Sequence, residues 1–233
     1  MFKKILSLIF LVAIVFSFSS CSRFTVEKHM EKAEKFEKQD RLSYANDEYR
    51  RALRGIVDPL KKAQVSEKVA ENFNKLREYD NSIKYYKESM DAYKQYNANL
   101  PEGQKTQKPP YVKLAAVYIA NEDPSSALAL LKNIELDSSA AGMQDLKLYE
   151  DKLEINRLVA DYYQKTGDLK TAIYYWNDYQ SLAEENELAD RQKFAKSNIK
   201  KLTQLTKNKN YKTEKEKKEK VINTKPAKVI RAY

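Results

Sequence analysis

The stretch LVADYYQKTGDLKTAIYYWNDY, residues 158–179, decides the fold. Its apolar residues recur at helical spacing on both sides of the polar segment Thr166-Gly167-Asp168, which indicates two helices joined by a tight turn. Gly167 suits the left-handed residue that closes a helix, and Asp168 suits the cap of the next helix. Ala160 and Ala172 stand twelve residues apart and are small enough to let two antiparallel helices approach closely. The stretch therefore predicts a helical hairpin with aromatic side chains beside the contact.

The same spacing recurs three times upstream. In each case two small residues stand twelve positions apart, and an aromatic residue follows the first of them by three positions. The small pairs are Ala33/Ala45, Ala70/Ser82, Ala115/Ala127 and Ala160/Ala172, and the aromatic residues are Phe36, Phe73, Tyr118 and Tyr163. Four matches in one register indicate an internal repeat, in which each hairpin buries its apolar face against its neighbours.

This pattern resembles the tetratricopeptide repeat (TPR) family, whose unit is a helix–turn–helix of about 34 residues. The resemblance covers about residues 25–185 and implies an all-α superhelix, a TPR-like solenoid of four hairpins. A last helix over 188–207, with Phe194, Ile199, Leu202 and Leu205 as its inner stripe, completes a predicted repeat domain over 25–206 as a capping helix. The units start 37, 45 and 45 residues apart, so the connections between hairpins are expected to be longer than in the family.

Residues 1–20 have the features of a secretory signal peptide. Lys3 and Lys4 precede an almost wholly apolar run over residues 5–18, which is too short to span a bilayer comfortably. The run ends at Phe18-Ser19-Ser20-Cys21, and Cys21 is the single cysteine of the chain. This arrangement resembles the lipobox of bacterial lipoproteins, in which cleavage leaves the cysteine as the first mature residue, carrying acyl chains such as palmitate.

The lipobox resemblance implies lipidation at Cys21, with residues 21–24 as a linker to the repeat domain. It places the mature chain outside the cytoplasm, anchored in the bacterial cell envelope, on the outer membrane if the host has one. The alternatives are an ordinary cleaved signal and an uncleaved anchor, each with a free thiol at Cys21.

The C-terminal residues 207–233 differ in composition from the rest of the chain. They contain ten Lys or Arg and three Glu and show no apolar periodicity, which predicts a disordered basic tail. Of the formal net charge of +10, this tail carries +7 and the signal peptide carries +2, so the repeat domain is close to neutral. The tail could touch anionic surfaces by unspecific attraction, or it could be merely solvated. Nucleic acid is not expected as a partner, because the repeat domain carries no basic stripe.

Side chains that carry chemistry are scarce. His29 is the single histidine, and neither a second histidine nor a nearby cysteine can join it in a metal site, so we expect it to pack. The four glycines do not form a phosphate-binding loop. The carboxylates alternate with lysines at helical spacing, as in EKAEKFEK (residues 31–38), which is typical of solvated ion pairs. We therefore predict no catalytic residues, no cofactor and no metal, and the protein is not expected to be an enzyme.

In TPR proteins the first helix of each unit lines a groove that receives a segment of a partner protein. The resemblance gives this role to three residues in each unit, and we call these twelve residues the groove positions: Met30, Glu34 and Glu37; Glu67, Glu71 and Asn74; Val112, Ala116 and Ile119; Arg157, Asp161 and Gln164. The first two sets are acidic and the third is apolar, which favours a basic or mixed amphipathic partner segment. The carboxylate clamp of some family members, which uses Lys and Asn, is not expected here.

The predicted function is that of a membrane-anchored adaptor or scaffold that binds envelope proteins through the groove positions. Complexes for outer-membrane assembly, secretion, pilus formation or motility are all compatible with the resemblance. One alternative is a regulator or enzyme of cell-wall metabolism, which as an enzyme would hold a shielded acid of raised pKa in a closed pocket. Another alternative is a wall-tethering structural lipoprotein that acts through its basic tail.

Overall fold

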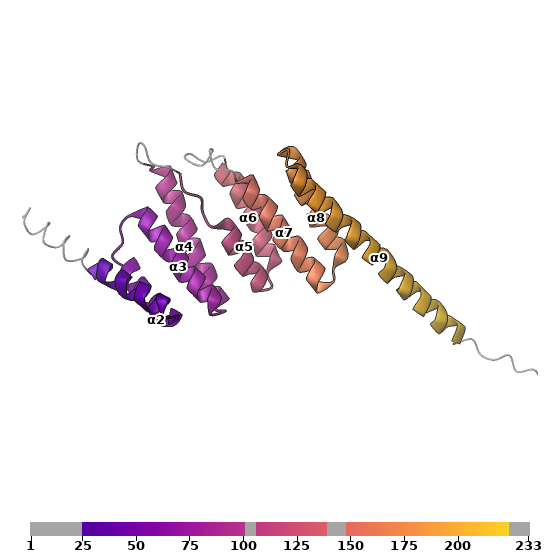
Figure 1. The fold of residues 1–233 in the computed structure, drawn as a ribbon, viewed down its shortest axis with the longest axis horizontal. Coiled ribbons are helices and arrows are strands. Elements are labelled where there is room, and N and C mark those ends of the chain that lie inside the picture. Colours follow the sequence, from indigo (N-terminus) through magenta and orange to yellow (C-terminus); the bar gives the residue numbers. More distant parts are fainter. Residues whose placement is uncertain (1–24, 101–105, 139–147, 224–233) are drawn as a thin grey trace, which may run out of the picture. The chain divides into compact units, whose positions relative to one another are not determined.

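The computed structural model describes residues 25–100, 106–138 and 148–223, with the backbone alone for residues 209–223. Within these residues the chain is all-α, with nine helices and no strand, which confirms the predicted class (Figure 1). A first helix covers residues 25–38. The others are α2 (Leu42–Leu53), α3 (Pro59–Lys75), α4 (Tyr79–Ala98), α5 (Tyr111–Ala120), α6 (Pro124–Ser138), α7 (Tyr149–Thr166), α8 (Leu169–Glu185) and α9 (Ala189–Asn223).

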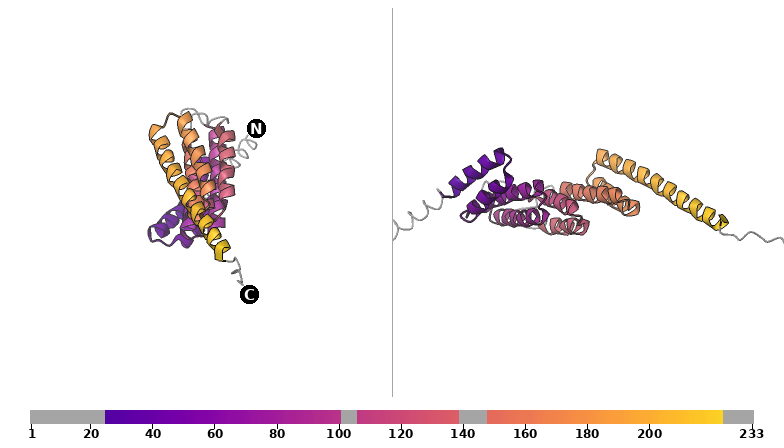
Figure 2. Two further views of the ribbon diagram at one scale, coloured as in Figure 1. Left: turned by 90° about the vertical axis from the view of Figure 1, so that its right-hand side faces the viewer. Right: turned by 90° about the horizontal axis from the view of Figure 1, so that it is seen from below.

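The stretch that was predicted as one repeat domain comprises two compact units. The first unit is Met1–Asp151 and the second is Lys152–Tyr233, so the boundary lies near the start of α7. In the first unit the helices pack mostly on their neighbours in sequence: α2 on α3, α3 on α4, α4 on α5, and α5 on α6. Figure 2 shows this sequential arrangement from two further sides. In the second unit α8 packs along α9.

The small residues of the repeat mark the places where helices touch. All eight of them are completely inaccessible to solvent, with an exposed fraction of 0%. In the second hairpin the contact is close enough for a direct hydrogen bond, in which the Ser82 hydroxyl donates to the Ala70 carbonyl oxygen at 2.8 Å. A larger side chain at any of these positions would force the two helices of its hairpin apart.

The four turns within the predicted hairpins also share one backbone conformation. A residue with positive φ closes the first helix in each case: Asp40 (56°), Arg77 (60°), Glu122 (57°) and Gly167 (85°). In the first three turns the next N–H donates back to the carbonyl of the repeated aromatic residue, namely Arg41 to Phe36, Glu78 to Phe73 and Asp123 to Tyr118, each at 2.9 Å. This is the closing hydrogen bond of a Schellman motif, so these three turns are built in the same way.

The predicted cap of α8 is confirmed in atomic detail, and α3 begins with a cap of the same kind. The Asp58 side chain accepts hydrogen bonds from the backbone N–H groups of Leu60 (3.4 Å) and Lys61 (3.0 Å), with Pro59 as the first residue of α3. Asp168 caps α8 by accepting from the Thr171 N–H at 3.2 Å and from the Thr171 hydroxyl at 2.7 Å. These caps set where the helices begin and therefore which residues face the core.

The core of the second unit is aromatic. The Trp176 and Tyr179 side chains of α8 are almost fully buried, and both rings contact Phe194 of α9, with ring centroids 5.4 Å and 6.4 Å apart. The predicted inner stripe of the last helix is only partly right. Leu202 is fully buried, but Phe194 and Leu205 are 49% and 45% exposed, whereas Ala195, the neighbour of Phe194, is completely buried.

The last helix is longer than predicted. Instead of ending near residue 207, α9 continues to Asn223, through most of the stretch that was predicted to be a disordered tail. Lys and Glu are strong helix formers, and Glu214/Lys218 and Glu216/Lys220 stand at the four-residue spacing that stabilises a helix. The missing apolar periodicity favours disorder, but these pairs stabilise a helix without an apolar face. Residues 224–233 lie outside the described residues.

The predicted signal peptide, Cys21 and the linker 21–24 also lie outside the described residues. Among the helices that the structure does describe, none combines the length and the apolar character needed to cross a bilayer.

Candidate partner-binding surface

The groove positions lie on the first helix of each predicted hairpin: the helix over 25–38, α3, α5 and α7. Glu34 is exposed and the other eleven side chains are half-buried, so each of the twelve is at least partly accessible. The first three sets belong to the first unit and the fourth set belongs to the second unit. None of the twelve side chains is buried in the core.

Three of the four acidic groove positions in the first two sets, Glu37, Glu67 and Glu71, are engaged by partners within the chain, which their sequence pattern did not predict. In the first hairpin the Tyr49 hydroxyl donates to a Glu37 carboxylate oxygen at 2.8 Å. The Lys68 ammonium of α3 lies 3.4 Å from the same carboxylate oxygen and 3.5 Å from the Tyr49 hydroxyl. Burial raises the pKa of Tyr49 far above its usual value, and the hydrogen bond to Glu37 adds to the increase. Tyr49 therefore stays protonated and acts as a donor.

A second group of the same kind joins the second and third hairpins. The Lys113 ammonium of α5 lies 2.7 Å from a Glu67 carboxylate oxygen and 2.5 Å from one of Glu71, both on α3. Glu67 also accepts a hydrogen bond of 3.1 Å from the Tyr93 hydroxyl of α4. Burial alone would lower the pKa of Lys113, but the hydrogen bonds to the two carboxylates outweigh it and raise the pKa, so the lysine remains charged.

These two groups occupy equivalent places in the repeat. Lys68 and Lys113 each stand two residues before the first small residue of their unit, Ala70 and Ala115. Each lysine reaches back to a carboxylate on the first helix of the preceding hairpin. The sequence held a signal for this contact, namely lysine at one register position in two successive units. The consequence is that Lys68 and Lys113 offset part of the negative charge of Glu37, Glu67 and Glu71, and a basic partner segment would have to compete with these two lysines.

The third and fourth sets of groove positions have different characters. Val112, Ala116 and Ile119 form a half-buried apolar stripe on α5. On α7, which the second unit contributes, Arg157 donates to Asp161 at 2.8 Å and to Glu154 at 2.5 and 2.8 Å. Hydrogen bonding to Glu154 raises the pKa of Arg157, whereas burial raises that of Asp161 despite the neighbouring guanidinium. The apolar stripe is therefore the set that contains no ion pair of its own.

His29 has a more polar role than the packing role predicted for it. Its Nδ1 lies 2.5 Å from a Glu48 carboxylate oxygen, and Arg51 pairs with the other oxygen of Glu48 at 2.7 Å. Burial alone would raise the pKa of Glu48, but the hydrogen bond with His29 and the nearby Arg51 lower it overall. The contact links the first helix to α2.

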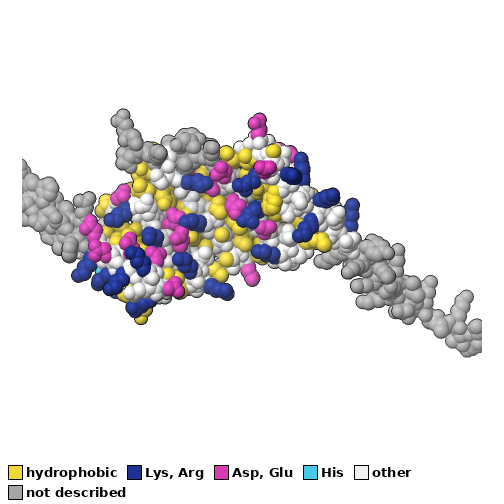
Figure 3. Space-filling model, in the orientation of Figure 1, with side chains coloured by type: hydrophobic (Ala, Val, Ile, Leu, Met, Phe, Trp, Pro, Cys, Tyr) yellow, Lys and Arg dark blue, Asp and Glu magenta, His cyan; other side chains and the backbone are white. Residues whose placement is uncertain are grey.

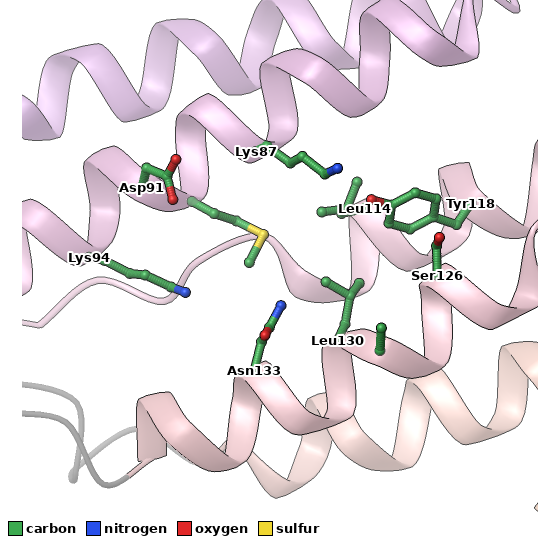
Figure 4. A pocket seen from close by; sticks show the side chains of 10 residues that line it. Lys87, Asp91, Lys94, Leu114, Tyr118, Ser126, Leu130 and Asn133 are labelled. Carbon is green, nitrogen blue, oxygen red and sulfur yellow. The ribbon is translucent and has the colours of Figure 1, made fainter.

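A hollow of about 410 Å³ lies on the first unit among α4, α5 and α6 (Figure 4). Met90, Leu114 and Leu130 supply its apolar lining, and Lys87 and Lys94 extend toward it from α4. Lys94 is already paired with Asp137 at 2.9 Å, and the Lys87 ammonium lies 5.8 Å from the centre of the Tyr118 ring. None of the groove positions lines this hollow, and no sequence pattern predicted it.

Asp151, the last residue of the first unit, is the side chain that best matches the shielded acid expected of a cell-wall enzyme. Its side chain is buried, and burial raises its pKa although the Lys108 ammonium lies 2.8 Å away. A second buried acid, Asp137, accepts a hydrogen bond from the Tyr111 hydroxyl. Neither acid lines either of the hollows described for this protein.

Among the described residues no cluster of three or more His, Cys, Asp or Glu side chains could hold a metal ion. What the described surface offers is twelve accessible positions on the first helices, which are apolar on α5 and include ion-paired side chains on α3 and α7. No family model matches the chain, and no curated protein is significantly similar to it.

Proposed function

We propose that the protein is a lipid-anchored TPR-like scaffold of a bacterial cell envelope, which binds partner proteins through the first helices of its hairpins. One observation carries the proposal above the others. The eight small residues that defined the repeat are all fully buried, and three of its turns close with the same hydrogen bond onto the repeated aromatic residue. Repeated hairpins of this kind serve mainly to present surface along their stacked helices.

The partner surface is centred on the apolar stripe Val112, Ala116 and Ile119. The acidic positions on either side of Lys113 are paired within the chain, which favours a mixed amphipathic segment over a purely basic one. Such a segment would place its apolar side chains on the stripe and its polar ones toward the Glu–Lys groups. The anchoring part of the proposal rests on the lipobox resemblance at Cys21. The lipid anchor would lie in the outer membrane if the host has one.

The proposal is tested by a matched pair of substitutions in one hairpin. Ala116→Lys places a charge in the apolar stripe of α5, and Ala129→Lys places the same charge on an exposed position of α6. With tagged protein expressed in the native host, we expect Ala116→Lys to reduce the recovery of the co-purifying envelope protein at least about tenfold, because an unpaired charge is costly in an interface. Ala129→Lys should leave recovery unchanged.

Equal recovery with both variants, at equal thermal stability, would contradict a partner site on the first helices. If instead Ala129→Lys reduces recovery and Ala116→Lys does not, the partner binds at the hollow among α4, α5 and α6, which Ala129 helps to line.

A further inference from the structure

We propose that the loop between α2 and α3 is a second membrane contact, which docks on the anionic lipid surface in which the protein is anchored. The inference rests on the proposed lipidation of Cys21 and deepens it by naming the face of the protein that meets the bilayer. The contact consists of four basic residues and one apolar residue, which we call the basic rim: Arg50, Arg51, Arg54 and Lys62, with Val57 at the loop tip.

The basic side chains border one open hollow of about 580 Å³ among α2, α3 and α4. Asp47 and Glu88 are the acids that also line it, so the four cations outnumber the acids by two to one. Arg51 is engaged by Glu48 at 2.7 Å, and Arg50 lies 3.7 Å from Asp47. Arg54 and Lys62 are in neither of these two ion pairs, so the positive charge at the hollow rests mainly on their side chains. Figure 3 shows Lys and Arg side chains, with Asp and Glu side chains among them, at the lower left of the molecule, where the first hairpin lies.

Val57 distinguishes a lipid surface from a small anion as the ligand. Its side chain is 92% exposed, more than any other large apolar side chain in the described residues. It lies between Arg54 and Lys62 in sequence, in a loop that runs GIVDP from Gly55 to Pro59. A free phosphate needs only the cations, whereas a bilayer interface accepts an apolar tip beside basic side chains.

The basic rim lies at the end of the first hairpin from which the anchor emerges. Because the first helix and α2 run in opposite directions, the end of α2 returns to the start of the first helix (Figure 1). The approach is close: a Cβ added to Gly55 would lie 2.5 Å from the Cγ2 atom of Val26. Cys21 precedes the first helix by only four residues, a length of chain that spans about 14 Å at most.

An acylated Cys21 would therefore hold the basic rim next to the headgroups. A polybasic surface beside a lipid chain is a known way to strengthen membrane attachment, since each cation close to an anionic leaflet adds to the attraction. Docking would also fix the direction in which the first hairpin leaves the membrane.

The test uses mature acylated protein reconstituted into vesicles of phosphatidylcholine alone or with phosphatidylglycerol. Val57→Cys supplies a thiol for an environment-sensitive fluorophore, since an acylated Cys21 has no free thiol and the chain has no other cysteine. Tyr44→Cys is the matched control, an exposed position near the start of α2, at the opposite end of that helix from the loop that holds Val57. We expect a lipid-borne quencher to quench the label at 57 in the anionic vesicles and to leave the label at 44 bright.

Arg54→Gln with Lys62→Gln should lower the ratio of docked to undocked loops about fivefold for each cation removed. The pair Lys35→Gln and Lys38→Gln, exposed lysines of the first helix, should leave that ratio unchanged. A label at 57 that stays bright on protein retained by the vesicles overturns the docking and leaves the anchor intact. Equal quenching in neutral vesicles, or equal effects of the two pairs, also overturns it. If the fluorophore also labels Cys21 and the vesicles do not retain the protein, Cys21 carries no lipid. That result overturns the anchor, and the docking with it.

Discussion

At the scale of single residues, Glu122 and Gly167 occupy the same place in two turns, seven residues after the first small residue of their units. Both have positive φ, 57° and 85°, but only glycine adopts this conformation without strain. Glu122→Gly should therefore raise the free energy of unfolding by about 0.5–1 kcal/mol, the relief of strain being partly offset by the flexibility of glycine in the unfolded chain. Gly167→Ala should lower it by about 1–2 kcal/mol.

The two substitutions make a matched test because they act on one conformation with opposite signs. An alanine Cβ at 167 would have no atom within 4 Å, so any loss there reports the backbone alone. Urea unfolding followed by circular dichroism gives both values. A Glu122→Gly variant less stable than the wild type would mean that the glutamate makes a stabilising contact in the turn.

Asp151 gives the protein an unusual dependence of stability on pH. Because its pKa is raised in the folded state, the folded protein keeps this proton at pH values where the unfolded chain, with an ordinary pKa near 3.9, has lost it. Its contribution to the free energy of unfolding therefore declines as the pH rises from about 3.9 through the folded value. Asp151→Asn removes this titration.

We expect the difference in unfolding free energy, wild type minus Asp151→Asn, to fall with rising pH across that window. Denaturant unfolding of both proteins at a series of pH values measures it. A difference that grows with pH would show that the ion pair with Lys108 outweighs the burial of the carboxylate.

At the scale of helices and hairpins, the small residues set how closely the two helices of a hairpin approach. Ala127 of α6 is completely buried, and Ala129 of the same helix is exposed. Ala127→Leu should lower the free energy of unfolding by about 1–3 kcal/mol, because the added atoms have no space between the helices. Ala129→Leu should change it by less than about 0.5 kcal/mol. Similar effects of the two would contradict a close contact at position 127.

Lys113 joins two successive hairpins by binding Glu67 and Glu71. Lys113→Met should lower the free energy of unfolding by about 1 kcal/mol, since it leaves two like charges four residues apart on α3. Adding Glu67→Gln and Glu71→Gln should recover most of the loss, and Lys132→Met, an exposed control on α6, should have little effect. If the triple variant recovers nothing, the lysine acts through packing of its aliphatic chain and not through the two acids.

The sequence predicted those elements that leave a repeated local signal. Ala115 and Ala127 stand twelve residues apart with Tyr118 and the turn between them, which predicted the third hairpin, and Asp168 predicted the start of α8. Two features were missed because their physical causes are not periodic. The Lys and Glu pairs that extend α9 act without an apolar face. The full burial of Ala195 beside the half-exposed Phe194 depends on how α9 packs, which the spacing of the large apolar residues does not show.

At the scale of the whole molecule, the candidate site was predicted as a set of positions but not as a chemical surface. The resemblance placed all twelve groove positions at accessible points. The acidic character predicted for the first two sets is partly offset by Lys68 and Lys113, and these pairings depend on how neighbouring hairpins pack. Within the first unit the apolar stripe on α5 is left as the part best suited to receive a partner, while the proposed anchor and the basic rim hold the first hairpin at the membrane.

Site-specific photo-cross-linking in living cells of the native host tests the scaffold most directly. A photoreactive amino acid is placed at Val112, in the apolar stripe of α5, and in a second strain at Lys132, on the outer side of the same hairpin. The scaffold account predicts one discrete adduct with an envelope protein from position 112 and none from position 132. Adducts of the same kind from both positions, or from neither, would contradict it.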